Sequence, residues 1–163
     1  MKRSIMIVFA IFALAFSAVL WADDAQDIRD LIMKESVSCK KADVEAIMSC
    51  YAQGFVGYWQ LSDNPEDIFV FINGLDDLRT NYALKMQKQE NIEPTSEVRH
   101  VSIKGDKAVA VSRHWKIVNN YPMGTHHTMW MVAKIKGQWL ITYFIADVKS
   151  DLPNVLQFYA PKQ

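Results

Sequence analysis

The clearest hydrophobic pattern in the chain is the alternation of side chains over residues 125–148. Two arms rich in β-branched and aromatic residues flank Lys136-Gly137, a dipeptide that suits a two-residue turn. This stretch therefore predicts one long antiparallel hairpin, on which the rest of the fold can be built.

A turn at this dipeptide divides the hairpin into two faces, because side chains alternate along a strand. One face carries large aromatic residues, namely Trp130, Trp139 and Tyr143. The other carries Met131, Thr142 and Phe144. Both faces are mostly apolar, so we expect helices to cover one and something else, such as a second subunit, to cover the other.

The hydrophobic periodicity also predicts three helices and four further strands before the hairpin. Apolar residues three and four apart predict helices over residues 23–39, 43–52 and 75–89. Runs of β-forming residues bounded by Gly, Asn, Asp or Pro predict strands over residues 55–61, 68–72, 97–103 and 107–118.

Two charged residues fall at positions where these patterns predict core. Glu35 continues the helical stripe that includes Ile28 and Ile32, and Arg113 shares a strand face with Val111. A buried Glu35–Arg113 pair could recognise or polarise a ligand. The alternative places Glu35 at a solvated helix edge and extends Arg113 out of the sheet.

Residues 1–22 have a different character from the rest of the chain. Lys2 and Arg3 precede an uncharged apolar run that ends at Ala22, a pattern typical of a secretory signal peptide. We therefore expect a mature domain over residues 23–163 that is periplasmic or secreted. An uncleaved membrane anchor is the alternative interpretation of the same run.

Composition narrows the choice of partners. The chain of 163 residues has 18 basic and 18 acidic residues, and loss of Lys2 and Arg3 leaves 16 basic ones. A length of this order suits one domain, and near neutrality gives no electrostatic footprint for nucleic acid or an acidic membrane surface. We therefore expect no nucleic acid partner, and no membrane association once the leader is cleaved.

Two cysteines remain in a chain that is expected to reach an oxidising compartment. Cys39 and Cys50 could form a disulfide or could be two buried thiols. Their separation suggests neither a redox CxxC motif nor a zinc site. The sequence also lacks a phosphate-binding Gly-rich loop and an HExxH helix, so we expect no metal and no cofactor.

The order of the predicted elements resembles the nuclear transport factor 2-like fold, also called SnoaL-like or ketosteroid isomerase-like. The segments that carry the resemblance are ADVEAI at 42–47 with Tyr51-Ala52, GLDDL at 74–78, VSIKGDKAV at 101–109 and KGQWLI at 136–141. The resemblance implies an α+β domain in which a strongly curved antiparallel sheet wraps around three helices as a cone with an internal pocket.

The resemblance also implies which residues line that pocket and which surface is outside. The implied pocket wall consists of Tyr51, Trp59, Arg113, Trp115, Met131, Thr142 and Phe144. Such a wall suits a small, mostly apolar molecule with one anionic or carbonyl group. The face with Trp130, Trp139 and Tyr143 would then lie outside as the interface of a homodimer.

Departures from the family pattern limit the activity that can be expected. Steroid isomerases of this fold have an aspartate that acts as general base where Trp59 falls, an aspartic acid near Met131 and a tyrosine near Glu35. None of these three residue types is present here at the matched position. Three functions stay open: an exported domain that binds a small molecule, an isomerase, dehydratase or cyclase that uses Glu35 and Arg113, and a dimeric assembly module without ligand. The first is preferred.

Overall fold

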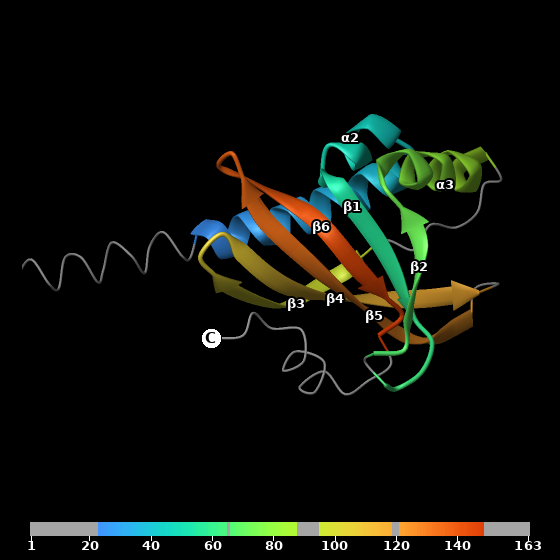
Figure 1. The fold of residues 1–163 in the computed structure, drawn as a ribbon. Helices are drawn as coiled ribbons and strands as arrows, with labels where there is room; N and C mark the ends of the chain where they lie inside the picture. Colours follow the sequence, from blue (N-terminus) through green and yellow to red (C-terminus); the bar gives the residue numbers. More distant parts are fainter. Residues whose placement is uncertain (1–22, 65, 88–94, 119–120, 149–163) are drawn as a thin grey trace, which may run out of the picture.

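The computed structural model describes residues 23–64, 66–87, 95–118 and 121–148. These residues form an α+β fold in which one curved sheet is covered by helices on its inner face (Figure 1). The predicted leader over residues 1–22 lies outside the described residues, so export and cleavage stay predictions.

The described chain starts with a helix that covers residues 23–40. Helix α2 spans Val44–Met48 and begins at the N-cap Asp43, whose carboxylate accepts a hydrogen bond from the Ala46 amide. Helix α3 spans Leu75–Gln87. The predicted second helix is too long at its end, because strand β1 already starts at Tyr51. Within the described parts of the chain, no helix is both long and apolar enough to cross a membrane.

The sheet contains six strands in the order β2-β1-β6-β5-β4-β3. They are β1 Tyr51–Gln60, β2 Ile68–Asn73, β3 Thr95–Lys104, β4 Lys107–Val118, β5 Tyr121–Ile135 and β6 Gln138–Ala146. All neighbours are antiparallel except β1 and β6, which run parallel. The predicted strands are thus confirmed, and the expected all-antiparallel sheet is corrected to a mixed one.

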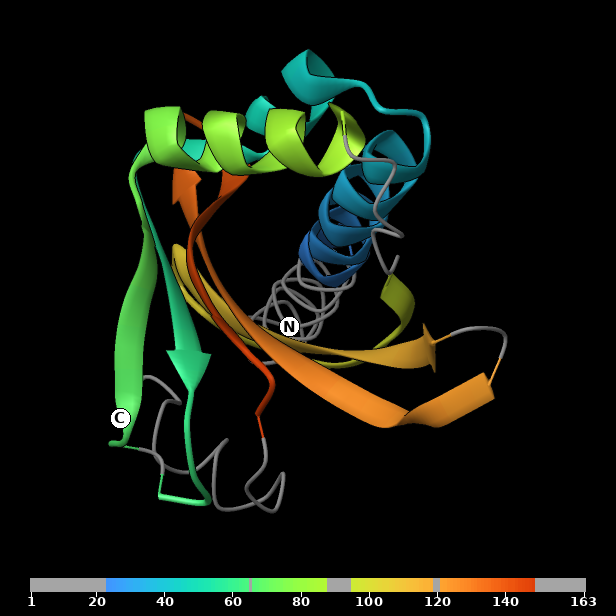
Figure 2. The same ribbon diagram turned by 90° about the vertical axis from the view of Figure 1, so that its right-hand side faces the viewer.

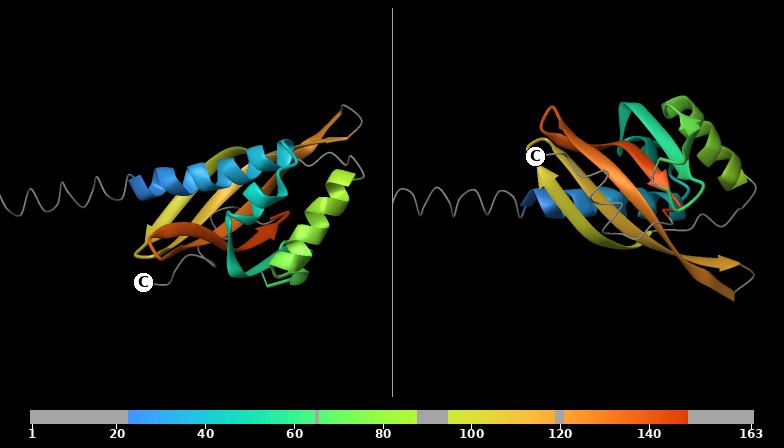
Figure 3. Two further views of the ribbon diagram at one scale, coloured as in Figure 1. Left: turned by 90° about the horizontal axis from the view of Figure 1, so that it is seen from above. Right: turned by 60° about the horizontal axis from the view of Figure 1, so that its bottom comes forward.

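The helices pack against one face of the sheet, here called the inner face (Figures 2 and 3). Ile28 and Ile32 of the first helix join Trp130, Val132 and Ile141 of the sheet in one buried cluster. The start of this helix is fixed to the β5–β6 hairpin, since Asp24 Oδ1 accepts hydrogen bonds from Lys134 Nζ at 2.6 Å and Trp139 Nε1 at 2.9 Å. The Lys134 hydrogen bond is the main reason that the pKa of Asp24 is lowered.

The predicted turn at Lys136-Gly137 is confirmed, but the predicted register holds for only part of the hairpin. Val132 pairs with Ile141 as expected, whereas Met131 pairs with Tyr143. Thr142 is therefore an extra residue on β6, a β-bulge whose hydroxyl donates a hydrogen bond to the Met131 carbonyl at 3.0 Å. Beyond this bulge every side chain of β6 has changed sides relative to β5.

The predicted assignment of inner and outer faces is wrong for the tryptophans. Trp130 and Trp139 are each only 4% exposed and belong to the inner cluster, together with Phe144. Met131 lies instead on the opposite, outer face, in a second cluster with Met129 and Ile145, where Tyr143 also lies as predicted. Because both faces of the hairpin are apolar, the pattern alone could not say which one the helices cover.

Two glycines on β1 give the fold a direct test. A Cβ at Gly57 would lie 3.1 Å from Ile72 Cβ and 3.3 Å from Phe144 Cζ, whereas a Cβ at Gly54 would meet no atom within 4 Å. We expect Gly57→Ala to lower the free energy of unfolding by about 1–3 kcal/mol through overpacking. Gly54→Ala should be neutral or stabilising by up to about 1 kcal/mol.

Denaturant unfolding of both variants beside the wild type measures these effects. Equal stability of the two alanine variants would contradict the assignment of Gly57 to the packed inner face and Gly54 to the open outer face.

Candidate functional site

A buried carboxyl group lies where the first helix, β1 and α3 meet. Glu35 is only 4% exposed, which confirms its predicted position on the core-facing stripe of the helix. Its Oε1 atom accepts hydrogen bonds from Tyr82 at 2.5 Å, from Tyr51 at 3.0 Å and from the Cys39 thiol at 3.4 Å. We call these four residues the acid cluster. It gives a buried polar group the partners that its burial requires.

Burial determines the protonation of this cluster. Desolvation raises the pKa of Glu35, although the hydrogen bonds from Tyr82, Tyr51 and Cys39 and the charge of Lys85 oppose it. Desolvation also raises the pKa values of Tyr51 and Tyr82 well above their ordinary value of 10.0. A carboxyl group whose pKa is raised in this way can hold and release a proton nearer to neutral pH than an exposed one.

Arg113 takes no part in the acid cluster, and the predicted Glu35–Arg113 pair is wrong. Glu97 lies opposite Arg113 in the β3–β4 register, and its Oε2 atom is 2.9 Å from Arg113 Nη2. Arg113 alternates with Ser112, whose hydroxyl accepts a hydrogen bond from the inner Trp130. Arg113 therefore lies on the outer face, across the sheet from Glu35.

The two cysteines are free thiols in the structure, which is the second of the two arrangements that the sequence allowed. Cys39 donates its hydrogen bond to Glu35, and Cys50 donates to the Ala46 carbonyl at 3.4 Å. Burial raises the pKa of Cys50 to about 11 and also raises that of Cys39. Few thiolates form at neutral pH, so neither group is suited to nucleophilic attack.

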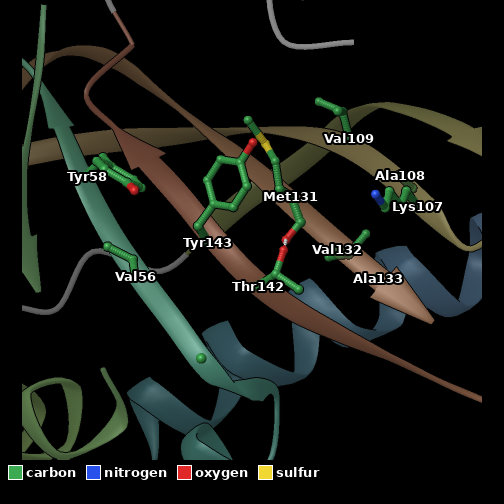
Figure 4. Close-up of a pocket in the computed structure, with 11 residues that line it drawn as sticks. Val56, Tyr58, Lys107, Ala108, Val109, Met131, Val132, Ala133, Thr142 and Tyr143 are labelled. Atoms are coloured by element: carbon green, nitrogen blue, oxygen red, sulfur yellow. Dashed lines mark hydrogen bonds between the residues drawn. The ribbon is translucent and has the colours of Figure 1, made fainter. Parts of the chain in front are cut away.

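A second candidate site is a hollow on the outer face, with a volume of about 620 Å³ (Figure 4). It crosses β1, β6, β5 and β4. We call this site the outer hollow. The residues that line it are Gly54, Val56, Tyr58, Lys107, Ala108, Val109, Met131, Val132, Ala133, Thr142 and Tyr143. This volume lies within the usual range of small-molecule pockets.

The outer hollow results from two irregularities that meet on β6. The Thr142 bulge interrupts the pairing of β6 with β5. On the other side, the pairing of β6 with β1 shifts between Tyr51 and Val56. Gly54 lies within this shift and has no side chain to fill the space. The sheet therefore opens where the bulge and the glycine are neighbours.

The polar side chains of the hollow are distributed across it, on β4, β6 and β1. Lys107 on β4 is the one charged residue in its lining, and Figure 4 shows Tyr58 at the far end of the site. The rings of Tyr58 and Tyr143 pack edge to face with centroids 5.9 Å apart. Burial, with a contribution from Tyr58, raises the pKa of Tyr143, so the Tyr143 hydroxyl stays protonated at neutral pH.

The structure separates the residues that the sequence grouped into one pocket. Tyr51 and Phe144 lie in the inner core, and Met131 and Thr142 line the outer hollow. Trp59 is 39% exposed and packs edge to face on Phe71. The side chain of Trp115 lies outside the described part of the structure.

Several residues of both sites were not predicted. Tyr82 lies within the predicted helix over residues 75–89, and the available signal was that the hydroxyl of a buried tyrosine needs a hydrogen-bond partner, which here is Glu35. The sequence signal for Gly54 and Lys107 as site residues was weaker. Gly54 directly precedes a predicted strand and lies inside the observed one, and Lys107 is next to a turn. Over the described residues, no group of three or more His, Cys, Asp or Glu side chains could hold a metal ion.

Comparison with solved structures identifies the class of fold. A nuclear transport factor 2-like protein of unknown function from Shewanella oneidensis is 19% identical, with a TM-score of 0.61 over 78% of this chain and 99% of its own. A related protein with a cystatin-like fold from Novosphingobium aromaticivorans is 11% identical, with a TM-score of 0.65 over 85% and 91% of the two chains. The chain therefore has the nuclear transport factor 2-like fold, as the sequence predicted.

One of the similar structures has a name that refers to an enzyme. A ketosteroid isomerase-like protein from Erwinia carotovora is 15% identical, with a TM-score of 0.52 over 73% of this chain and 91% of its own. No protein-family model matches the sequence, and no curated protein does. At these identities the likeness defines the fold and leaves the activity to the residues of the two sites.

The raised pKa of Glu35 predicts how stability depends on pH. The folded state holds the proton to higher pH than the unfolded state, whose pKa is near 4.5. The free energy of unfolding should therefore fall as the pH rises above this value. Glu35→Gln keeps an acceptor oxygen for the three donors but cannot ionise, so this part of the pH dependence should disappear.

Thermal unfolding of both proteins between pH 4 and 8 measures the difference, with Glu66→Gln on the exposed β1–β2 connection as the matched control. Parallel pH profiles of wild type and Glu35→Gln would contradict the role assigned to Glu35.

Proposed function

We propose that this protein is an exported domain that binds a small, mostly apolar molecule in the outer hollow. The observation that carries the proposal is the hollow itself, a site of about 620 Å³ lined by more apolar than polar side chains. Ligand sites commonly have this size and this balance of surfaces. The fold is compatible with binding, since it positions the lining on four hydrogen-bonded strands.

The location of the site differs from the internal pocket that the resemblance implied. In the described interior, the aromatic rings of Tyr51, Phe55, Phe144 and Trp130 follow one another with centroids 4.5, 5.4 and 5.4 Å apart. These rings pack against one another between the helices and the sheet, in the same buried cluster as Ile28 and Ile32 of the first helix. The outer hollow, in contrast, is open and has room for a ligand beside Gly54.

The test is native and denaturing mass spectrometry of protein exported with its own leader. We expect a mature chain that starts at Asp23 and carries a noncovalent molecule of about a few hundred daltons, a size that suits such a site. Gly54→Leu should lose this molecule, because Gly54 lines the hollow and a Cβ there meets no protein atom within 4 Å, so the larger side chain would take up space in the hollow.

Unfolding of Gly54→Leu at the wild-type temperature serves as the control for folding. A molecule that Gly54→Leu retains would place the ligand elsewhere, and a wild type that carries nothing and binds nothing would contradict the proposal. The same native spectrum tests the predicted homodimer, which stays a prediction.

A second function, an isomerase, dehydratase or cyclase, is favoured by one specific observation. Glu35 is a buried acid with a raised pKa whose oxygen contacts two tyrosine hydroxyl groups. Such a group could move a proton at a carbon atom next to a carbonyl. Arg113 pairs with Glu97, so the electrophilic partner in this proposal is a tyrosine hydroxyl rather than the guanidinium.

Proton transfer of this kind can be measured without knowledge of the natural substrate. In D₂O, the protein should catalyse exchange of the α-hydrogens of a small cyclic ketone such as cyclohexanone, followed by NMR, and Glu35→Gln should abolish the exchange. Glu66→Gln should exchange at the wild-type rate. Equal rates with wild type and Glu35→Gln would exclude Glu35 as the base.

A further inference from the structure

The charge distribution of the outer hollow identifies the class of ligand. We propose that the ligand is an elongated apolar monoanion, such as a fatty or aryl carboxylate, whose anionic group binds Lys107 and whose apolar part lies against Met131 and the tyrosine pair. This inference rests on the proposed function, because it needs the hollow to be a binding site. It adds the sign of the ligand charge and the direction in which the ligand lies.

The first argument is the one-sided charge of the lining. Of its eleven residues only Lys107 is charged, and none is acidic. Within the described parts of the chain, Lys107 makes no ion pair with an acidic side chain. An ammonium group at the rim of an apolar site favours an anion over a neutral or cationic molecule, by Coulomb attraction and by charge-assisted hydrogen bonds.

The second argument is a like-charge pair at the same rim. The β3–β4 register places Lys104 directly opposite Lys107, so both side chains emerge on the outer face. Like charges in this position are destabilising unless an anion is near. The turn between them contributes one acidic residue, Asp106, so this turn of the hairpin carries two basic residues and one acidic residue.

The third argument is the order of side chains across the sheet. From Lys107 on β4, the site passes over Met131 on β5 and Tyr143 on β6 to Tyr58 on β1, as Figure 4 shows. Charge is thus confined to one end, and the middle combines the apolar side chains of Val109 and Met131 with the hydroxyl groups of Thr142 and Tyr143. The tyrosine rings at the other end offer an edge-to-face aromatic surface. A linear molecule with one anionic end matches this order.

The experiment compares three probes that share one alkyl chain, namely decanoate, 1-decanol and decyltrimethylammonium. Each is titrated into the full mature chain, and NMR signals of the Val56, Val109 and Met131 methyl groups report occupation of the hollow. We expect decanoate to bind about ten- to a hundredfold more tightly than decanol, which is the contribution of one hydrogen bond to a charged group. Decyltrimethylammonium should bind most weakly.

Variants separate the contribution of charge from that of the apolar surface. Lys107→Gln should reduce decanoate affinity to that of decanol and leave decanol unchanged. Gly54→Leu should weaken both probes, because it fills the space they share. Lys136→Gln, an exposed lysine at the β5–β6 turn outside the lining, is the matched control and should change neither.

The outcomes distinguish this inference from the proposed function. Equal affinity for decanoate and decanol, or a preference for decyltrimethylammonium, would overturn the anionic class while the hollow remained a ligand site. If no probe shifts the three methyl signals in the wild type, the proposed function and the inference both fail. Loss of decanoate preference in Lys136→Gln would also overturn the role of Lys107.

Discussion

The extra residue at Thr142 is the constraint on which the rest of the sheet depends. Before it, the register of β5 and β6 follows from the two-residue turn, and after it every side chain of β6 faces the other way. Phe144 thereby joins Trp130 under the helices, and Tyr143 joins Met131 outside. One bulge thus builds the aromatic interior and opens the hollow on the opposite face.

The order of elements, the hairpin turn and the burial of Glu35 could be predicted because each has a local cause. Periodicity defines a strand or a helix, a two-residue turn needs particular residues, and Glu35 continues a helical stripe. The faces of the hairpin could not be predicted in this way. Both are apolar, so a one-residue slip leaves the alternation of polar and apolar positions almost unchanged.

The same distinction applies to the site residues: a local pattern could identify a residue as unusual, but it could not identify a partner that is distant in the sequence. Arg113 was expected to meet Glu35 because each is a charge in an apolar pattern, but a strand pattern does not say which neighbouring strand supplies the partner. Its partner is Glu97, which lies opposite it on β3. Likewise Tyr82 reaches Glu35 from 47 positions away, a distance in sequence at which no periodicity operates.

The two sites differ in how freely each could change during evolution. The acid cluster connects the first helix, β1 and α3 through one carboxyl oxygen, so any change at Glu35 alters folding as well as chemistry. The outer hollow has the opposite property. Gly54 can accept a side chain and Lys107 is exposed, so its size and charge can vary with little effect on the core. The lining of the hollow can therefore change without loss of the fold, whereas the protonation of the acid cluster is tied to the stability of the fold.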